Sequence, residues 1–222
     1  PYAALNPRMT VRDIIAEPLE VMELVQTREE ADQKVREIAS KCRLNLEHLR
    51  RFPHAFSGGQ RQRISIARTL VCSPNFVVAD ESVAALDVSI QADILNLLKS
   101  LQNNLGLTFL FISHDLSVVA HICDTVAVMY LGTIVESAPT RSLFTQPKHP
   151  YTKALLSAIP TLNPEDRGKA QKLEGEIPSP VNPPSGCRFH TRCPVAEDRC
   201  RKEVPQWRES SPGHSVACHL VG

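Results

Sequence analysis

The chain has 222 residues, of which 42% are hydrophobic, so it can bury a substantial core in one large domain or two small ones. Its 25 Lys and Arg residues nearly balance its 24 Asp and Glu residues, and a net charge of +1 gives no reason to expect nucleic acid or an acidic surface as a partner. No apolar stretch approaches the roughly 20 residues of a membrane-spanning helix, and the first residues resemble no secretion signal, so we expect a soluble, intracellular domain.

Residues 11–50 have a helical pattern. Thr10 is suited to cap the first helix, because its hydroxyl can accept a hydrogen bond from a backbone N–H of the first turn. Residues Arg28–Lys41 repeat the helical spacing with many charges. The apolar residues that recur at helical spacing in the first helix are Val11, Ile14, Ile15 and Leu19.

A further helical segment, Arg61–Val71, follows the residues Ser57, Gly58, Gly59 and Gln60. Two adjacent glycines allow backbone N–H groups to approach a ligand, and a helix N-terminus attracts anions. The hydroxyl of Ser57 can cap the helix or donate to an oxygen. The pattern therefore indicates a phosphate-facing loop, although an ordinary glycine-containing turn explains these four residues equally well when they are taken alone.

From about residue 75 the sequence alternates between short apolar runs and amphipathic helices. Asn75–Ala79, Thr108–Ile112 and Thr125–Tyr130 are typical of strands, and Ser89–Asn103 and Leu116–Ile122 of the helices between them. This β-α-β-α-β order predicts an α/β fold with a mainly parallel sheet that is covered on both faces.

Reactive side chains follow two of these strands. Asp80 and Glu81 come at the end of the first, and His114 and Asp115 come just after the second. Ligands of parallel sheets bind at the carboxyl ends of the strands, so these residues are candidates for a functional site. Taken alone, an Asp-Glu pair or a histidine after a strand is more often a solvated turn or a structural residue.

Most of the 17 prolines lie beyond residue 138, and the run 178–184 cannot form a helix or a central strand. We therefore interpret residues 137–222 as an appendage. It would contain a short helical part around Tyr151–Ile159, a proline-rich arm and a group of cysteines.

Four motifs resemble those of ATP-binding cassette (ABC) ATPases, in the order and spacing of that family. Phe56–Arg63, with the helix after it, resembles the ABC signature, and Phe76–Glu81 resembles the Walker B strand. Ala85–Asp87 resembles the D-loop, and Ser113–Leu116 the segment of the switch histidine. The resemblance implies a partial RecA-like parallel sheet core with a helical subdomain.

The resemblance also implies a role for each candidate residue. Asp80 would hold Mg²⁺, partly through water, and Glu81 would polarise the attacking water. His114 would reach the γ-phosphate. Residues 57–60 would contact an ATP held by a second nucleotide-binding domain, and Asp87 would lie at the interface between the two domains.

Two departures from the family pattern are visible. Ser82, Val83 and Ala84 stand where Pro, Thr or Val, and Ser are typical, and the missing proline frees the backbone just after Glu81. No G-x-x-x-x-G-K-[ST] loop (Walker A) occurs, and residues 1–8 resemble the stretch after the Q-loop glutamine. We therefore expect that the chain starts part-way through a longer subunit and, as given, binds ATP weakly and does not hydrolyse it alone.

Several further strings resemble the ATPases of dipeptide, oligopeptide and nickel importers, and in particular the second of their two ATPases. This resemblance implies a subunit at the cytoplasmic face of the membrane that powers peptide import with a second ABC ATPase subunit and two membrane permeases. An extracytoplasmic peptide-binding protein would deliver the solute, and roughly residues 1–55 would contact the permeases. The strings are Tyr2–Arg8, Arg51–Phe56, Leu86–Gln91, His149–Leu156, Glu174–Pro180 and Gly186–Cys193.

With this family as a guide, we divide the chain into three parts. Residues 1–73 would form a helical subdomain that ends in the signature helix, and residues 74–136 a partial RecA-like core. Residues 137–222 would form the C-terminal extension. The competing classes are a non-transport ABC protein acting on DNA or ribosomes, a non-catalytic interaction module, and an importer of nickel or another small solute.

The extension holds four cysteines in the spacing C-x5-C-x6-C-x17-C. Four thiolates can hold a [4Fe–4S] cluster or a tetrahedral Zn²⁺, and the absence of a C-x2-C pair favours the cluster over zinc; free thiols are the third possibility. A disulfide is disfavoured in a reducing cytosol. The four are Cys187, Cys193, Cys200 and Cys218, whereas Cys42, Cys72 and Cys123 have the pattern of small buried apolar residues.

Overall fold

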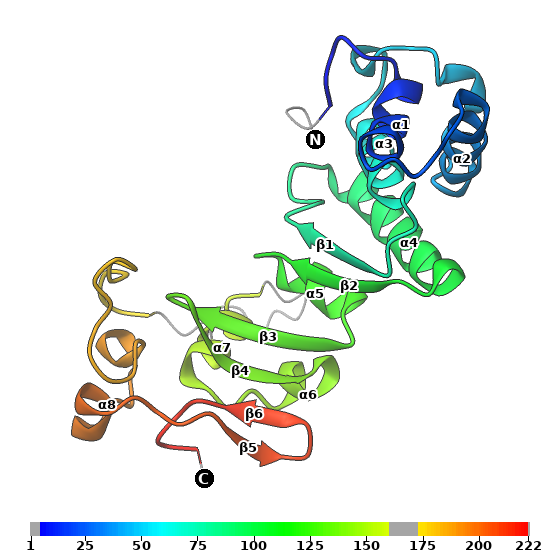
Figure 1. Cartoon of the computed structure of the whole chain (residues 1–222). Helices are drawn as coiled ribbons and strands as arrows, with labels where there is room; N and C mark the ends of the chain where they lie inside the picture. The colour runs from blue at the N-terminus through cyan, green and yellow to red at the C-terminus, as the bar shows by residue number, and fades with distance from the viewer. Residues whose placement is uncertain (1–4, 160–172, 222) are drawn as a thin grey trace. The chain divides into compact units, whose positions relative to one another are not determined.

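The computed structural model describes residues 5–159 and 173–221, and its contacts divide the chain into an N-terminal unit, residues 1–114, and a C-terminal unit, residues 115–222 (Figure 1). The predicted division after residues 73 and 136 stays a prediction. Residues 1–4, which form part of the strings that resemble importer ATPases, lie outside the described residues.

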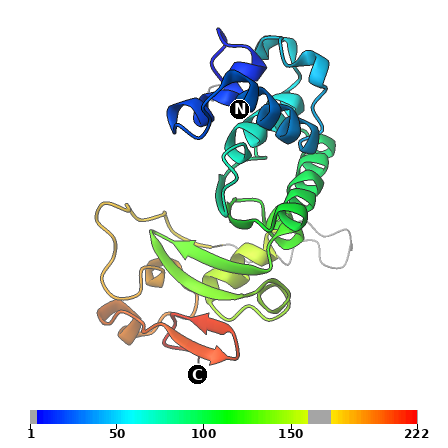
Figure 2. The ribbon, with the colours of Figure 1, turned by 45° about the vertical axis from the view of Figure 1, so that its right-hand side comes forward.

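Helices α1 (Val11–Val21), α2 (Arg28–Lys41) and α3 (Gly58–Leu70) pack together at the start of the N-terminal unit (Figure 2). The predicted cap is confirmed, because the Thr10 side chain accepts a hydrogen bond from the backbone N–H of Asp13. Short 3₁₀ turns, η1 (Leu46–His48) and η2 (Pro53–Ala55), lie between α2 and α3. The core of this part is apolar and fully buried, and includes Ile14, Ile15, Leu19, Val35 and Ile64.

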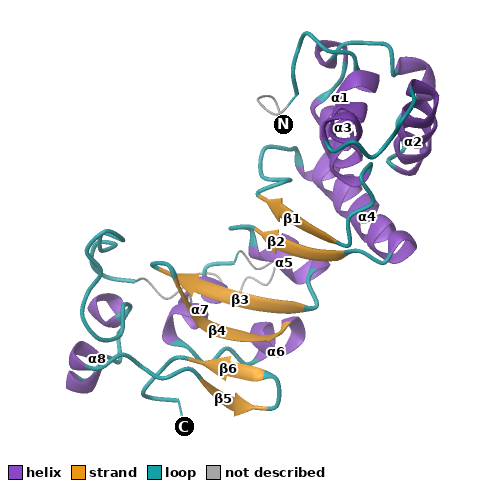
Figure 3. Cartoon of the chain, viewed as in Figure 1, coloured by secondary structure: helices purple, strands orange, loops and turns teal. Residues whose placement is uncertain are grey.

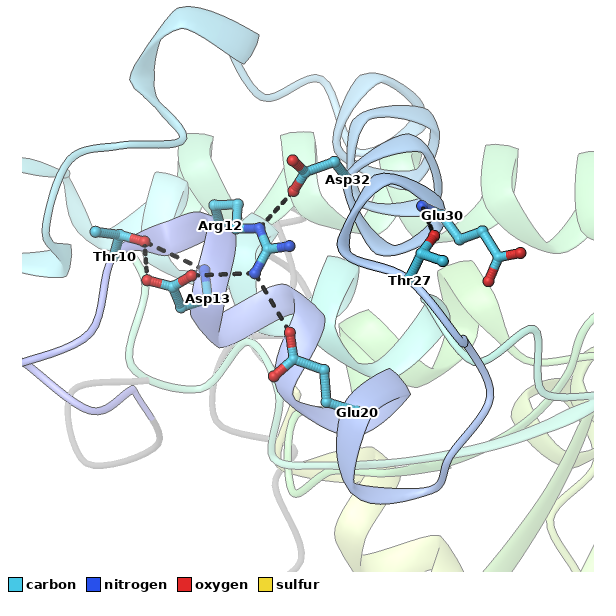
Figure 4. A network of polar contacts seen from close by, with 7 residues as sticks. All are labelled: Thr10, Arg12, Asp13, Glu20, Thr27, Glu30 and Asp32. Atoms are coloured by element: carbon cyan, nitrogen blue, oxygen red, sulfur yellow. Dashed lines mark hydrogen bonds and ion pairs between the residues drawn. The ribbon is translucent and has the colours of Figure 1, made fainter.

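Arg12 joins α1 to α2 at the rim of this core (Figure 4). Its Nε lies 2.6 Å from a carboxylate oxygen of Asp32 on α2, and its Nη1 lies 3.2 Å from Asp13 and 3.3 Å from Glu20 on α1. Asp32 and Glu20 are about half exposed, so water screens these ion pairs. The network orients the two helices, while the apolar core supplies most of the stabilisation.

Strands β1 (Phe76–Asp80) and β2 (Thr108–Ile112) pair in parallel, with Phe76 opposite Thr108 and Asp80 opposite Ile112. Helix α4 (Val88–Leu105) connects them and ends at Gly106, whose φ of 65° is the left-handed conformation that glycine adopts without strain. The predicted β-α-β unit is confirmed, and its register brings the carboxyl ends of the two strands together.

Strands β3 (Thr125–Tyr130) and β4 (Thr133–Pro139) form an antiparallel hairpin in the C-terminal unit (Figure 3). The turn residues Leu131 and Gly132 both have positive φ, 44° and 76°, which matches the right-handed twist of the strands. The expectation that 125–130 belongs to the parallel sheet is therefore wrong. Because the turn is so short, the chain reverses directly after β3, and β3 pairs antiparallel with β4.

The hairpin β5 (Arg208–Ser211) and β6 (His214–Val216) completes a four-stranded antiparallel sheet in the order β3-β4-β6-β5. Helix α7 (Pro150–Ser157) confirms the short helix predicted in the extension. The other elements of this unit among its described residues are α5 (Leu116–Ile122), which was predicted, and α6 (Thr140–Thr145), η4 (His190–Arg192) and α8 (Asp198–Lys202), which were not.

Aromatic rings pack together in the core of the C-terminal unit, beside aliphatic side chains of β3 and β4. Phe189 is 1% exposed, and its ring centroid lies 5.2 Å from Tyr130, 5.3 Å from Tyr151 and 5.7 Å from His149. These separations are those of favourable edge and tilted contacts. A residue of the proline-rich region thus packs onto the β3–β4 hairpin and holds the extension to it.

A buried carboxylate lies beside this core. Glu136 on β4 is fully buried and accepts hydrogen bonds from the backbone N–H groups of Lys148 and His149, at 2.7 and 2.9 Å. Nε2 of His214, on β6, lies 2.6 Å from the same carboxylate. Three donors from two distant parts of the chain therefore satisfy one buried acid, a contact that the sequence did not reveal.

Candidate functional site

Helix α3 begins at Gly58, three residues earlier than predicted, so both glycines lie inside its first turn. Ser57 is the N-cap, and it forms a capping box with Gln60: the Gln60 N–H lies 3.4 Å from the Ser57 hydroxyl, and the Ser57 N–H donates to the Gln60 side chain at 3.0 Å. The Ser57 hydroxyl can still donate its own proton to an oxygen beyond the helix end. The local geometry therefore fits an anion-facing helix start.

The two glycines also have a packing role that the sequence reasoning missed. A Cβ on Gly59 would lie 2.6 Å from Cγ2 of Ile90, on α4, which is too close for any real side chain. A Cβ on Gly58 would lie 3.8 Å from Leu86, an ordinary contact. Gly59 is thus required where the start of α3 meets the start of α4, and this contact brings the signature residues near the Ala85–Asp87 segment.

Asp80 ends strand β1, and Glu81 follows it with a φ of 45°. This left-handed conformation costs a non-glycine residue about 1–2 kcal/mol. Two backbone hydrogen bonds hold it: the Glu81 N–H donates to Ile112 at 3.0 Å, and the Ala84 N–H donates to the Glu81 carbonyl at 3.2 Å. A strained backbone at a reactive carboxylate is typical of a functional position.

The two predicted catalytic residues, Glu81 and His114, contact each other. Nδ1 of His114 lies 3.0 Å from a carboxylate oxygen of Glu81, although the two residues are 33 positions apart. Both side chains are exposed, 72% for His114 and 59% for Glu81, so the pair is open to a ligand. The parallel register of β1 and β2 creates this contact because it places both strand ends at one edge of the sheet.

The remaining predicted residues lie on other elements. Asp87 is the N-cap of α4, but its side chain makes no capping hydrogen bond, so the carboxylate is not used by its own helix. Ser57 and Gln60 bond to each other at the start of α3. The structure thus joins Glu81 with His114, and keeps the signature residues as a separate group on a different helix.

The four cysteines of the extension lie close enough together for their charges to interact. The Cys187 N–H donates to the Cys200 carbonyl at 2.8 Å, and Cys187 and Cys193 pack against the core. Burial raises the pKa of Cys187, Cys193 and Cys218, and charge on neighbouring cysteines adds to the rise. Burial thus favours the neutral thiol at these three positions.

Within residues 5–159 and 173–221, no group of three or more His, Cys, Asp or Glu side chains is arranged to hold a metal ion. The predicted iron–sulfur or zinc site is therefore not supported.

Solved ABC cassettes share this fold. CbiO1 from Clostridium perfringens, part of the ABC transporter complex CbiONQ, matches 65% of this chain and 56% of its own length, with a TM-score of 0.58 and 25% identity. The dimeric structure of MJ0796, a bacterial ABC transporter cassette, matches 62% of this chain and 59% of its own length, with a TM-score of 0.53 and 27% identity. The predicted ABC-type α/β fold is confirmed.

Two family models match the chain: "ABC transporter" over residues 2–84, and "Oligopeptide/dipeptide transporter, C-terminal region" over residues 135–200. The putative oligopeptide transport ATP-binding protein YkfD of Bacillus subtilis is 55% identical over 99% of this chain and 68% of its own length. The chain belongs to the ABC transporter ATP-binding family, in its oligopeptide/dipeptide branch. A putative peptide import ATP-binding protein of Brucella ovis is also 55% identical, and AppF of Bacillus subtilis is 51% identical.

Membership of this ABC family confirms the resemblance that the four motifs indicated. It also accounts for the extension, because the C-terminal model covers β4, α7 and the first three cysteines of the cluster. Among the described residues, no helix combines the length and the apolar character that crossing a lipid bilayer requires.

Proposed function

We propose that the chain is part of an ATP-binding and ATP-hydrolysing subunit that powers the import of dipeptides or oligopeptides. The contact between Glu81 and His114, beside Asp80, is the observation that supports hydrolysis. The match to peptide-import relatives over nearly the whole chain supports peptides as the cargo. The C-terminal region that such relatives share supports the same assignment.

The residues present fit ATP and Mg²⁺. A carboxylate at the end of a strand, as in Asp80, is the oxygen ligand that Mg²⁺ prefers. The start of α3 offers the Ser57 hydroxyl and the N–H groups of Gly58 and Gly59 to a phosphate. When bound, Mg²⁺ would supply charge to stabilise the phosphoryl transfer. Asp80 would hold the ion, and these α3 groups would bind the phosphate of an ATP held mainly by a partner domain.

Glu81 and His114 would carry the chemistry of the chain itself. The Glu81 carboxylate would accept a proton from the attacking water and orient it. His114 would hold Glu81 in place through Nδ1, which leaves Nε2 to contact the γ-phosphate. Asp87, with its side chain not used as a cap, would face the partner domain across the interface.

The partners follow from this role. A second ABC ATPase subunit would supply the main phosphate cradle, and two membrane permeases would carry the solute, delivered by an extracytoplasmic binding protein. The subunit would work at the cytoplasmic face of the membrane, with residues 1–55 on the permeases. The 222-residue polypeptide alone would not turn over ATP, because its sequence contains no G-x-x-x-x-G-K-[ST] loop.

The test is ATP hydrolysis and peptide uptake by the full-length subunit, reconstituted with its permeases and second ATPase in proteoliposomes. We expect Glu81→Gln to lower ATP hydrolysis by about 10²–10⁴-fold without preventing ATP binding, because only the water-activating group is lost. Asp93→Asn, at an exposed carboxylate on α4, is the matched control and should leave the rate unchanged. Uptake of nickel in place of peptides would overturn the cargo, and an unchanged rate in Glu81→Gln would overturn the catalytic assignment.

A further inference from the structure

Residues 174–185 form a proline-rich arm of the C-terminal unit that contains no helix or strand (Figure 1). Both of its ends are held by the unit. The Ser185 hydroxyl donates to the Arg201 carbonyl at 3.0 Å, and the backbone of Gly175 lies beside Thr191, whose carbonyl oxygen would be 3.8 Å from a Cβ at that glycine. The arm is therefore a loop with a fixed base.

The middle of the arm presents apolar side chains to solvent. Val181 is 92% exposed, and Ile177 is exposed as well. The prolines of 178–184 fix φ and restrict the residues before them, which favours the extended polyproline II conformation. Such a segment loses little conformational entropy on binding, and aromatic surfaces recognise it. The charged residues of the arm, Glu174 and Glu176, are both acidic, so the surface that would suit it is aromatic and basic.

Two stretches of the same unit, residues 201–208 and 218–221, lie side by side and form what we call the Trp207 surface. Nε2 of His219 lies 2.9 Å from the Glu203 carbonyl oxygen. The Arg208 guanidinium donates to the carbonyl of Cys218 at 3.2 Å. These contacts bring the exposed side chains of the two stretches into one region.

The Trp207 surface is both apolar and basic. Its indole ring belongs to a residue that is 49% exposed, and the large apolar side chains of Val204 and Leu220 are exposed too. Within residues 201–208 the sequence has three cations and one carboxylate. That carboxylate, Glu203, is paired with Arg199 at 2.8 Å, so the surface keeps a net positive charge.

We propose that the arm of one chain docks on the Trp207 surface of a second copy of the chain, and that the second arm docks reciprocally on the first chain. Proline and aliphatic side chains would pack on the indole ring, and the acidic residues of the arm would face the cations of the surface. Within one chain, the exposure of Val181 and Trp207 shows that the arm leaves its own surface open.

The position of the arm suits a symmetric contact. Ser185 at its base is bonded to Arg201, with which the Trp207 surface begins. Because the arm adjoins the surface in each chain, one twofold axis can pair each arm with the opposite surface. This contact joins C-terminal units and needs no ATP, so it goes beyond the ATP-held pairing of the proposed function.

Sedimentation equilibrium of the 222-residue chain without nucleotide tests the self-association. We expect a dimer that high salt weakens. Val181→Asn removes one buried valine from each of two contacts, worth about tenfold each, so the dissociation constant of the dimer should rise about 100-fold. Val195→Asn, at an exposed valine outside the arm and the Trp207 surface, is the matched control and should leave it unchanged. A chain that stays monomeric, or an unchanged dissociation constant in Val181→Asn, would overturn the proposal.

Mixing two complementary variants tests which surfaces meet. The Trp207→Ala chain contains no tryptophan but keeps its arm, whereas the Val181→Asn chain keeps Trp207. Adding the first chain to the second should shift the Trp207 emission to shorter wavelength, because the intact arm covers the ring. A chain with both changes should cause no shift. An equal shift with that double variant, or no shift with either chain, would contradict docking of the arm on Trp207.

The same emission distinguishes a second chain from a lipid surface. If vesicles of anionic phosphatidylglycerol shift the Trp207 emission and a second chain does not, the surface docks on membranes and the proposal is overturned. None of these measurements depends on ATP hydrolysis. A monomeric chain would therefore leave the proposed ATPase function standing, and an assembly that hydrolyses no ATP would leave the docking of the arm standing.

Discussion

In the N-terminal unit, Arg12 and Asp32 pair at the rim of an apolar helical core, and the Asp32 side chain is 47% exposed. In the C-terminal unit, Glu136 and His214 meet inside the core, with side chains that are 0% and 3% exposed. Water can replace the first contact when it breaks, but not the second. The helical part therefore depends mainly on apolar packing, whereas the C-terminal unit combines an apolar core with a buried polar network.

The largest effect is expected when the buried network loses a donor. His214→Ala should lower the free energy of unfolding of the C-terminal unit by about 3–5 kcal/mol, because the Glu136 carboxylate would be left buried and incompletely paired. Trp207, the single tryptophan of the chain, lies in this unit and reports its denaturation by fluorescence.

His219→Ala is the matched control for this variant. His219 is part of an exposed contact, with Nε2 at 2.9 Å from the Glu203 carbonyl, so its loss should cost less than about 1 kcal/mol. Equal losses of unfolding free energy in His214→Ala and His219→Ala would mean that the buried pair contributes no more than a surface contact. The contrast between the two units would then fail.

Acid should give the next largest effect, again in the C-terminal unit. Burial lowers the pKa of His149 from 6.5 to about 4, although the charge of Glu136 opposes the shift. The unfolded chain therefore takes up a proton below pH 6.5 that the folded chain refuses until about pH 4. The stabilisation that depends on neutral His149 is complete above pH 6.5. The free energy of unfolding should fall by about 3 kcal/mol between pH 6.5 and about pH 4.

The variant His149→Asn isolates this effect. Nδ1 of His149 accepts a hydrogen bond from the Tyr151 N–H at 3.1 Å, and asparagine can cap α7 in the same way without titrating. Urea denaturation between pH 7 and pH 4 should show a smaller fall in the variant than in the wild type. Parallel pH profiles would show that His149 is not the group responsible.

The smallest effect is expected at the rim of the N-terminal unit. Asp32→Ala should cost less than about 1 kcal/mol, because Arg12 keeps Asp13 and Glu20 and the contact is open to solvent. The loss should shrink further in high salt. The loss of unfolding free energy is measured by circular dichroism during urea denaturation, at low and high salt, with the exposed Asp93→Ala as a control. A loss as large as that of His214→Ala would remove the contrast between the two units.

Much of the candidate site follows from short segments. Ser57 and Thr10 cap their helices as the sequence predicts, and strands Thr108–Ile112 and Thr125–Tyr130 have the predicted bounds. The roles of Glu81 and His114 came from motifs, but their 3.0 Å contact did not. The close approach of Gly59 to Ile90 was missed as well, because a sequence does not say which helix lies opposite a glycine.

The sequence alone determined what depends on neighbours along the chain: the caps, the helical and strand periods, the motif order, and hence the ABC family. The tertiary structure decided what joins distant residues: the antiparallel pairing of β3, and the contact of Glu136 with His214 across 78 positions. It also buried the hydroxyls of Ser65 and Ser82, which come from different parts of the chain. The physical reason is that local hydrogen bonds and side-chain spacing fix an element, whereas burial is a property of several elements together, and it turns an ordinary Glu, His or Ser into a group that must find a partner.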